Sequence, residues 1–255
     1  MTKPSPKLHV FSSTQELGEA AATLVARLSA RAIAERGRFT VALSGGSLPK
    51  LVGPPLAAEP LRSEIDWSAW HVFWADERWL PLNHPDSNFR LARECLFDHV
   101  KIPVAQIYPI DDSYDPSDTA KMYQAILAQL FQPPPGHPPR FDLILLGMGE
   151  DGHTASLFPN HPLLHETRHW VTAITDSPKP PPDRITLTLP VINNARHVAF
   201  LAAGPGKADI LPQVLESDTS STALPARLVQ PSDGELYWFV DEAAAVKLQH
   251  HGEVG

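Results

Sequence analysis

Short apolar runs rich in β-branched residues alternate along this chain with longer stretches of helical periodicity. This alternation predicts an α/β fold, in which a doubly wound, mostly parallel sheet carries helices on both faces. Such folds bind their ligands at the carboxyl ends of the strands. The predicted strands are Leu8–Phe11, Phe39–Leu43, His71–Ala75, Asp142–Leu146, Val171–Thr175, Ile185–Leu189, Val198–Ala202 and Leu236–Val240, and the predicted helices are Gln15–Glu35, Asn88–Phe97, Ser117–Phe131 and Lys207–Glu216.

The formal net charge of −8 argues against a nucleic-acid or anionic-membrane surface, so we expect neither as a partner. The single cysteine, Cys95, has no second cysteine for an internal disulfide, and no signal-like segment precedes Leu8. We therefore expect a cytoplasmic protein. We separately expect a monomer. If the ligand is an anion, its positive potential must come from a few local residues.

Many of the 27 prolines gather in three runs, Pro133–Pro135, Pro138–Pro139 and Pro178–Pro182. The first two runs come directly before a predicted strand, which favours a loop within one domain over a linker between two. The third could be an extended ligand for a partner's aromatic groove, although strands flank it closely. We expect one domain over residues 1–255, with loose ends near 1–7 and 247–255.

Two polar motifs follow predicted strands. Ser44-Gly45-Gly46-Ser47 comes directly after Phe39–Leu43, and a proline suited to a first helical turn follows it. Its glycines let backbone N–H groups converge on an anion at a helix N-terminus, so the loop is a candidate phosphate site; a plain tight turn is the alternative. Asp76-Glu77-Arg78 closes the strand His71–Ala75, where Arg78 would supply a permanent positive charge.

A third motif, from Gly147 to Thr154, follows the strand Asp142–Leu146 and places Asp151 two residues before His153. Histidine titrates near neutral pH, and a carboxylate can fix its tautomer, so the pair suits activation of water. The segment also matches G-x-G-x-x-G, but a dinucleotide site needs a long helix after the last glycine. Pro159 and Pro162 interrupt the chain there.

Three further features remain open from the residues alone. His165-Glu166-Thr167-Arg168-His169 fits the zinc-protease pattern, yet a proline before it and a β-prone run after it favour a short surface helix. Lys207 lies in a glycine-flanked turn after Val198–Ala202, and Arg184 precedes Ile185–Leu189. Both cations lie at turns beside strands, although surface charge is the ordinary role of such residues.

Taken in order, the serine–glycine loop, Asp76-Glu77-Arg78, the segment Gly149–Pro159, the segment Ser177–Thr188 and Gly206-Lys207-Ala208 resemble 6-phosphogluconolactonase. The likeness covers nearly the whole chain, and Asp-Gly-His-Thr-Ala-Ser-Leu-Phe-Pro is its most specific part. It implies a Rossmann-like sheet shared with hexosamine-phosphate deaminases, and hydrolysis of 6-phosphogluconolactone to 6-phosphogluconate in the oxidative pentose phosphate pathway.

The resemblance also implies residue roles. His153 corresponds to the general base, with Asp151 beside it and Arg78 near the lactone. For the hydrolysis itself we further expect Asp76 to orient Arg78 or a sugar hydroxyl. The Ser44–Ser47 loop and Lys207 would hold the phosphate, with Arg184 as a further contact. The substrate is then a small sugar phosphate, and no step needs a metal or an organic cofactor.

Two rival functions stay open. An amino-sugar-phosphate deaminase or isomerase on the same scaffold would carry a catalytic glutamate five residues after the histidine, where this chain has Phe158. A sugar-phosphate sensor would keep the Ser44–Ser47 loop but would not require His153 beside Asp151. Assays for acid release and ammonia release distinguish the three.

Overall fold

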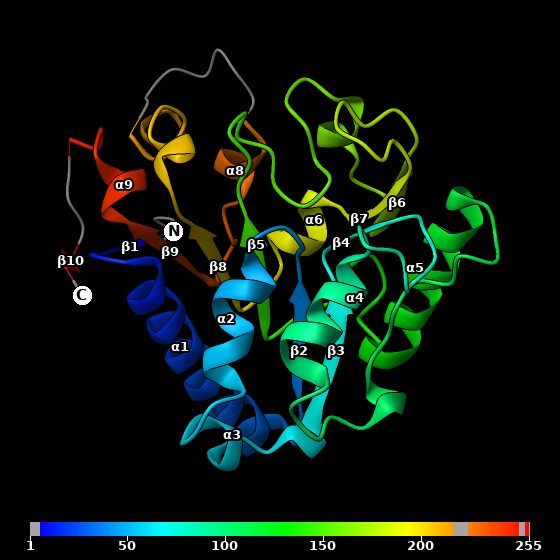
Figure 1. Ribbon diagram of the computed structural model, residues 1–255. Helices are drawn as coiled ribbons and strands as arrows, with labels where there is room; N and C mark the ends of the chain where they lie inside the picture. The colour runs from blue at the N-terminus through cyan, green and yellow to red at the C-terminus, as the bar shows by residue number, and fades with distance from the viewer. Residues whose placement is uncertain (1–5, 217–223, 250–252, 255) are drawn as a thin grey trace.

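A parallel sheet runs through the centre of the computed structural model, which describes residues 6–216, 224–249 and 253–254 (Figure 1). Within these ranges it has seven strands in the order β10-β1-β9-β8-β5-β2-β3, and each pair is parallel. The strands are β1 (Lys7–Phe11), β2 (Phe39–Leu43), β3 (Trp70–Trp74), β5 (Leu143–Gly147), β8 (His197–Ala202), β9 (Glu235–Asp241) and β10 (Glu253–Val254). This sheet, flanked by helices, confirms the predicted fold class.

The central strands bury side chains on both faces, as expected of a parallel sheet that helices cover twice. In β2, Val41 and Leu43 pack on one face, and Ala42 between them packs on the other. All five residues of this strand are buried. Four of its five residues are apolar, and only Thr40 is polar, which explains why the predicted bounds of the strand match the observed ones.

A smaller antiparallel sheet stands beside the main one in the order β4-β7-β6. It consists of β4 (Asp76–Arg78), β6 (Val171–Ile174) and β7 (Arg184–Leu187). The sequence prediction did not separate β6 and β7 from the parallel sheet. They are antiparallel because the proline-rich connection between them contains no crossover helix, which a parallel pair requires.

The two faces of the main sheet are covered by different helices. On one face lie α1 (Thr14–Arg36), α2 (Leu48–Leu56) and α4 (Asn88–Ala92), and on the other lies α5 (Pro116–Phe131) (Figure 1). Shorter helices are α3 (Leu61–Glu64), α6 (Leu189–Ile192), α7 (Leu211–Leu215), α8 (Pro225–Leu228) and α9 (Glu242–Ala245), with 3₁₀ turns at Trp67–Ala69, Val104–Gln106, Pro162–His165 and Pro205–Lys207 and a π-helical turn at Arg93–Phe97. Within the described ranges, no helix combines the length and apolarity that crossing a bilayer requires.

Two predicted helices differ from the structure. The helix expected over Lys207–Glu216 begins at Leu211, because Pro212 lacks an N–H group and fits only the first turn of a helix. The surface helix expected at His165–His169 is also wrong: a 3₁₀ turn ends at His165, and irregular chain follows. Here His169 contacts Glu166 through Nδ1 at 3.0 Å, so the two side chains satisfy each other.

Candidate active site

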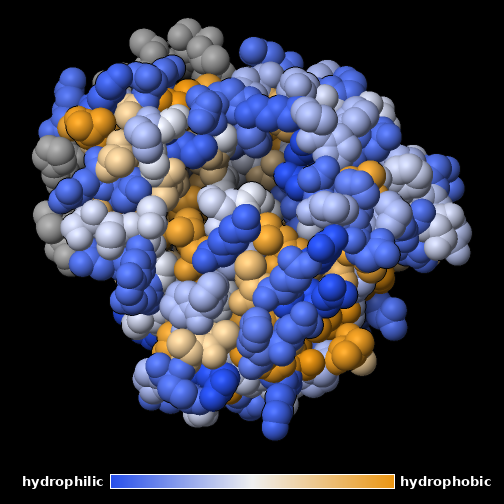
Figure 2. Space-filling model, in the orientation of Figure 1, coloured by the Kyte–Doolittle hydropathy of each residue, from blue (hydrophilic) through white to orange (hydrophobic). Residues whose placement is uncertain are grey.

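A cavity of about 320 Å³ opens where β2, β5 and β8 end. Figure 2 shows a recess in the upper half of this face, above the central strands of Figure 1. The lining includes nine of the ten residues that the sequence singled out, namely Ser44, Gly45, Gly46, Ser47, Asp76, Arg78, His153, Arg184 and Lys207. The tenth, Asp151, does not line the cavity but contacts His153 directly. Parallel strand order thus brings together residues that are far apart in the sequence.

The serine–glycine loop joins β2 to α2. Gly46 has a φ of 69°, a left-handed conformation that glycine adopts without steric cost. Among the described residues, the N–H groups of Gly46 and Ser47 donate to no protein acceptor, so they remain available to an anion at the start of α2. The hydroxyl of Ser44 instead donates to Oδ1 of Asp76 at 2.6 Å, so its hydrogen is already engaged.

Asp76 connects two parts of the site. Its Oδ1 accepts from Ser44, and its Oδ2 accepts from the hydroxyl of Ser156 at 2.9 Å. Asp76 is buried, and no hydrogen bond links it to Arg78 within the described chain. The carboxylate therefore fixes the serine–glycine loop against the segment that follows His153, a contact that the sequence did not suggest.

Glu77 and Arg78 point to different places. Glu77 is buried and accepts the N–H groups of Asn88 and Phe89, both at 2.7 Å, so it binds the start of α4. Burial raises the pKa of Glu77 to about 7. Arg78 lines the cavity and donates through one terminal nitrogen to the carbonyl of Asp86 at 2.7 Å. Of these two neighbours, only Arg78 reaches the cavity.

His153 and Asp151 form the shortest polar contact at the cavity, with Nδ1 and Oδ1 2.5 Å apart. A carboxylate on Nδ1 favours the tautomer that carries its proton there and leaves Nε2 as the acceptor. The imidazole is one-fifth exposed and packs at 4.9 Å, ring centre to ring centre, against the buried Phe158. A neutral His153 therefore presents a basic nitrogen beside a solvent-accessible cavity.

Lys179 is the third member of this group. Its Nζ lies 3.2 Å from Oδ1 of Asp151 and 3.3 Å from Nδ1 of His153. The lysine comes from the proline run Pro178–Pro182, which the structure places at the cavity rim. The sequence analysis assigned no role to Lys179; its one local signal is the rigid proline run that encloses it.

Burial and charge set the protonation states of His153 and Asp151. Burial lowers the pKa of His153 below its ordinary value; Asp151 opposes this shift, and the positive charge of Lys179 adds to it. Burial acts to raise the pKa of Asp151, but the hydrogen bond with His153 and the neighbouring cations outweigh it and lower the pKa to about 2. At neutral pH the pair is therefore a neutral imidazole beside a carboxylate.

The two remaining cations, Arg184 and Lys207, differ in the hydrogen bonds that they make with the protein. Arg184 is buried, and it donates to the carbonyls of Lys179, Pro180 and Pro181, so it holds the proline run in place. Burial lowers the pKa of Lys207, which the nearby charge of Glu150 partly offsets. The ammonium of Lys207 makes no hydrogen bond within the described residues, and it remains available to a ligand.

The dinucleotide-binding and zinc-protease interpretations of the sequence lack the structural features that each requires. No helix follows Gly152, where a dinucleotide-binding motif would need one, because the next segment is a bridge and a series of turns. In the part of the chain that the structure describes, no three or more His, Cys, Asp or Glu side chains gather as metal ligands would.

Comparison with known proteins agrees with this geometry. Residues 12–238 match the model of the family described as glucosamine-6-phosphate isomerases/6-phosphogluconolactonase. The chain is 47% identical over 249 residues to a protein of Oryza sativa subsp. indica named probable 6-phosphogluconolactonase 4, chloroplastic, covering 94% of this chain and 76% of that protein. It is 43% identical over 255 residues to probable 6-phosphogluconolactonase 1 of Arabidopsis thaliana, covering 96% and 95%.

A solved structure is also similar. The 6-phosphogluconolactonase from Trypanosoma cruzi superposes with a TM-score of 0.85 at 30% sequence identity, covering 98% of this chain and 100% of that one. The likeness thus extends over nearly the whole chain.

Proposed function

The chain belongs to the glucosamine-6-phosphate isomerase/6-phosphogluconolactonase family, and on that premise we propose that it hydrolyses 6-phosphogluconolactone to 6-phosphogluconate. The observation that carries the proposal is the 2.5 Å contact between His153 and Asp151 at a cavity with two lysines. A lactone is an internal ester, so its hydrolysis needs an activated water, a stabilised oxyanion and a proton for the leaving ring oxygen.

His153 performs both proton transfers. Its Nε2 takes a proton from water as the water oxygen attacks the lactone carbonyl, and a tetrahedral oxyanion forms. When the bond from the carbonyl carbon to the ring oxygen breaks, the imidazolium returns the proton to that oxygen. Asp151 holds the imidazole in the reactive tautomer and stabilises its protonated form.

Arg78 stabilises the oxyanion, an interaction for which one well-placed donor contributes roughly 3–4 kcal/mol. Its guanidinium lines the cavity and is permanently charged. Asp76 acts as a positioning residue, because its two serine contacts hold the loop after β2 and the segment after His153 together.

The phosphate binds at the opposite side of the cavity. The N–H groups of Gly46 and Ser47 and the ammonium of Lys207 bind its oxygens, while Gly45 and Ser44 shape the loop. Arg184 contributes through the proline run that it holds, and Lys179 adds positive charge near the reacting end. These cations supply a local positive potential in a chain whose net charge is −8.

Phe158 separates this function from deamination of an amino-sugar phosphate. It is buried against the imidazole of His153 and has no group that can transfer a proton. We expect acid release from 6-phosphogluconolactone above the spontaneous rate, and no ammonia release from glucosamine 6-phosphate. Ammonia release, or acid release at only the spontaneous rate, would overturn the proposal; the latter would leave a binding protein.

A further inference from the structure

A second cavity, of about 370 Å³, lies at the opposite end of the sheet, where β2, β5 and β8 begin. It shares no lining residue with the cavity at the carboxyl ends. Its walls come from the end of α1, the proline-rich segment 131–140 and the turn before β8. The proposed lactonase reaction uses none of these residues.

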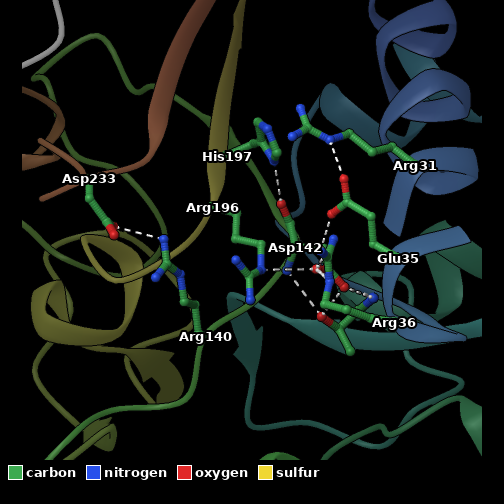
Figure 3. Close-up of polar contacts among 9 residues, drawn as sticks. Arg31, Glu35, Arg36, Arg140, Asp142, Arg196, His197 and Asp233 are labelled. Carbon is green, nitrogen blue, oxygen red and sulfur yellow. Dashed lines mark hydrogen bonds and ion pairs between the residues drawn. The ribbon is translucent and has the colours of Figure 1, made fainter. Parts of the chain in front are cut away.

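Four arginines line this second cavity. Arg36 and Arg38 flank the glycine that ends α1, Arg140 precedes β5, and Arg196 precedes β8. Figure 3 shows Arg36 and Arg196 extending from different segments toward Asp142, and Arg140 extending toward Asp233. Guanidinium groups stay ionised at every physiological pH, so this is a concentrated positive charge in a chain of net charge −8.

The carboxylates nearby are already engaged. Asp142 lies 3.0 Å from a terminal nitrogen of Arg36 and 3.5 Å from Nε of Arg196. Asp142 also accepts hydrogen bonds from the N–H of Thr40 at 2.9 Å and from the hydroxyl of Thr40 at 2.8 Å. It therefore links the starts of β2 and β5. Asp233 binds Arg140 at 2.8 Å from an exposed position.

The positive charge without a counter-ion in the described chain is that of Arg38, because Arg36, Arg140 and Arg196 each form an ion pair. Arg38 has no hydrogen bond or ion pair within the described chain. Burial lowers the pKa of Arg196, and the charges of Arg36 and Arg140 lower it further, while Asp142 and Glu35 raise it. The three guanidinium groups therefore repel one another, and the two carboxylates offset part of that repulsion. A bound anion would relieve that repulsion.

The walls are shaped before any ligand arrives. Pro133, Pro134 and Pro138 have fixed φ angles, and the side-chain amide of Asn194 donates to the carbonyl of Pro138 at 2.9 Å. This bond fastens the proline-rich segment to the turn that carries Arg196. A preformed wall lowers the entropy that binding would cost.

We propose that this cavity binds a small oxyanion with two or more negative charges, of the pyrophosphate type. Planar guanidinium groups donate pairs of hydrogen bonds to phosphate oxygens, and several of them around one cavity match a ligand with several oxygens. The volume of about 370 Å³ suits a small molecule. The site is separate from the lactonase cavity, so it stands whether or not the proposed reaction is correct.

The test is a calorimetric titration with inorganic pyrophosphate. Three proteins are compared: the unsubstituted chain, Arg38→Gln/Arg196→Gln, and the charge-matched control Arg62→Gln/Lys121→Gln. The control residues form exposed ion pairs with Glu59 and Asp118, away from the cavity. Pyrophosphate bound at the lactonase cavity would contribute the same heat of binding in all three proteins. A difference in binding between them therefore reports the arginine cavity alone.

We expect the double arginine variant to bind pyrophosphate about 10-fold more weakly or worse, and the control to match the unsubstituted chain. A fourth protein, Arg38→Gln alone, loses no hydrogen bond within the described chain, so it should fold normally and bind pyrophosphate roughly 3-fold more weakly or worse. Unchanged affinity in Arg38→Gln, equal affinity in all three proteins, or no binding to the unsubstituted chain would overturn the assignment.

Discussion

Gly149 faces the imidazole of His153 so closely that a Cβ on this glycine would lie 2.0 Å from Nδ1. The same Cβ would lie 2.6 Å from Oδ1 of Asp151. The N–H of Gly149 donates to the carbonyl of His153 at 2.8 Å, so the turn also holds the histidine backbone. The absence of a side chain at this position is what leaves room for the imidazole–carboxylate contact.

The first prediction follows from that contact. Gly149→Ala should displace the imidazole and lower kcat by roughly 10-fold or more, since small displacements of a catalytic group are costly. Gly147→Ala is the control, because it lines the same cavity and its Cβ would meet nothing within 4 Å. Steady-state acid release measures both. Equal activity of the two variants would mean that the His153–Asp151 geometry does not limit turnover.

The second prediction concerns the base itself. His153→Ala should lower kcat by about 10²–10⁴-fold, the usual contribution of general acid–base catalysis. Binding of 6-phosphogluconate should change little, because the phosphate contacts lie elsewhere in the cavity. His169→Ala is the matched control, since it removes a histidine that pairs with a carboxylate at the surface. Near-normal turnover without His153 would refute its role.

Much of the fold could be predicted because its strands are apolar runs with clear ends. β2 and β8 agree with their predicted bounds to within one residue. β4 was missed since Asp76, Glu77 and Arg78 are all charged, and only pairing with β7 makes this triplet a strand. Cross-strand pairing of this kind carries no local sequence signal.

The candidate site, like the fold, was predictable from the sequence only in part. Its motifs could be found because each follows a strand, and parallel order brings strand ends together. The contacts of Asp76 with Ser44 and Ser156 could not be predicted from the sequence, because they join residues 32 and 80 positions apart. Lys179 was overlooked for a similar reason: its charge matters only where the proline run folds back onto Asp151.

The third prediction is a pH dependence with two opposite shifts. The imidazole acts as a base only when neutral, so kcat/KM should fall as the pH drops through the pKa of His153. Burial lowers that pKa, which places the acid limb below the ordinary histidine range. Lys179→Met removes a charge that lowers the pKa, so the limb should move to higher pH.

Asp151→Asn should do the reverse, because the carboxylate raises the pKa of His153. Its acid limb should therefore move to lower pH, while kcat falls as the tautomer is no longer fixed. Profiles of kcat/KM against pH for the two variants and the unsubstituted protein provide the measurement. Shifts in the same direction would show that another group controls the acid limb.

The fourth prediction tests the phosphate side of the cavity. Lys207→Ala should lower kcat/KM for 6-phosphogluconolactone by roughly 10- to 100-fold, chiefly through KM, as expected for a lost hydrogen bond to a charged group. Hydrolysis of unphosphorylated gluconolactone should be unaffected, because the ammonium then has no anionic partner. Lys50→Ala, an exposed lysine of α2 outside the cavity, is the charge-matched control. Equal losses on both lactones would instead place Lys207 at the reacting end, beside His153 and Arg78.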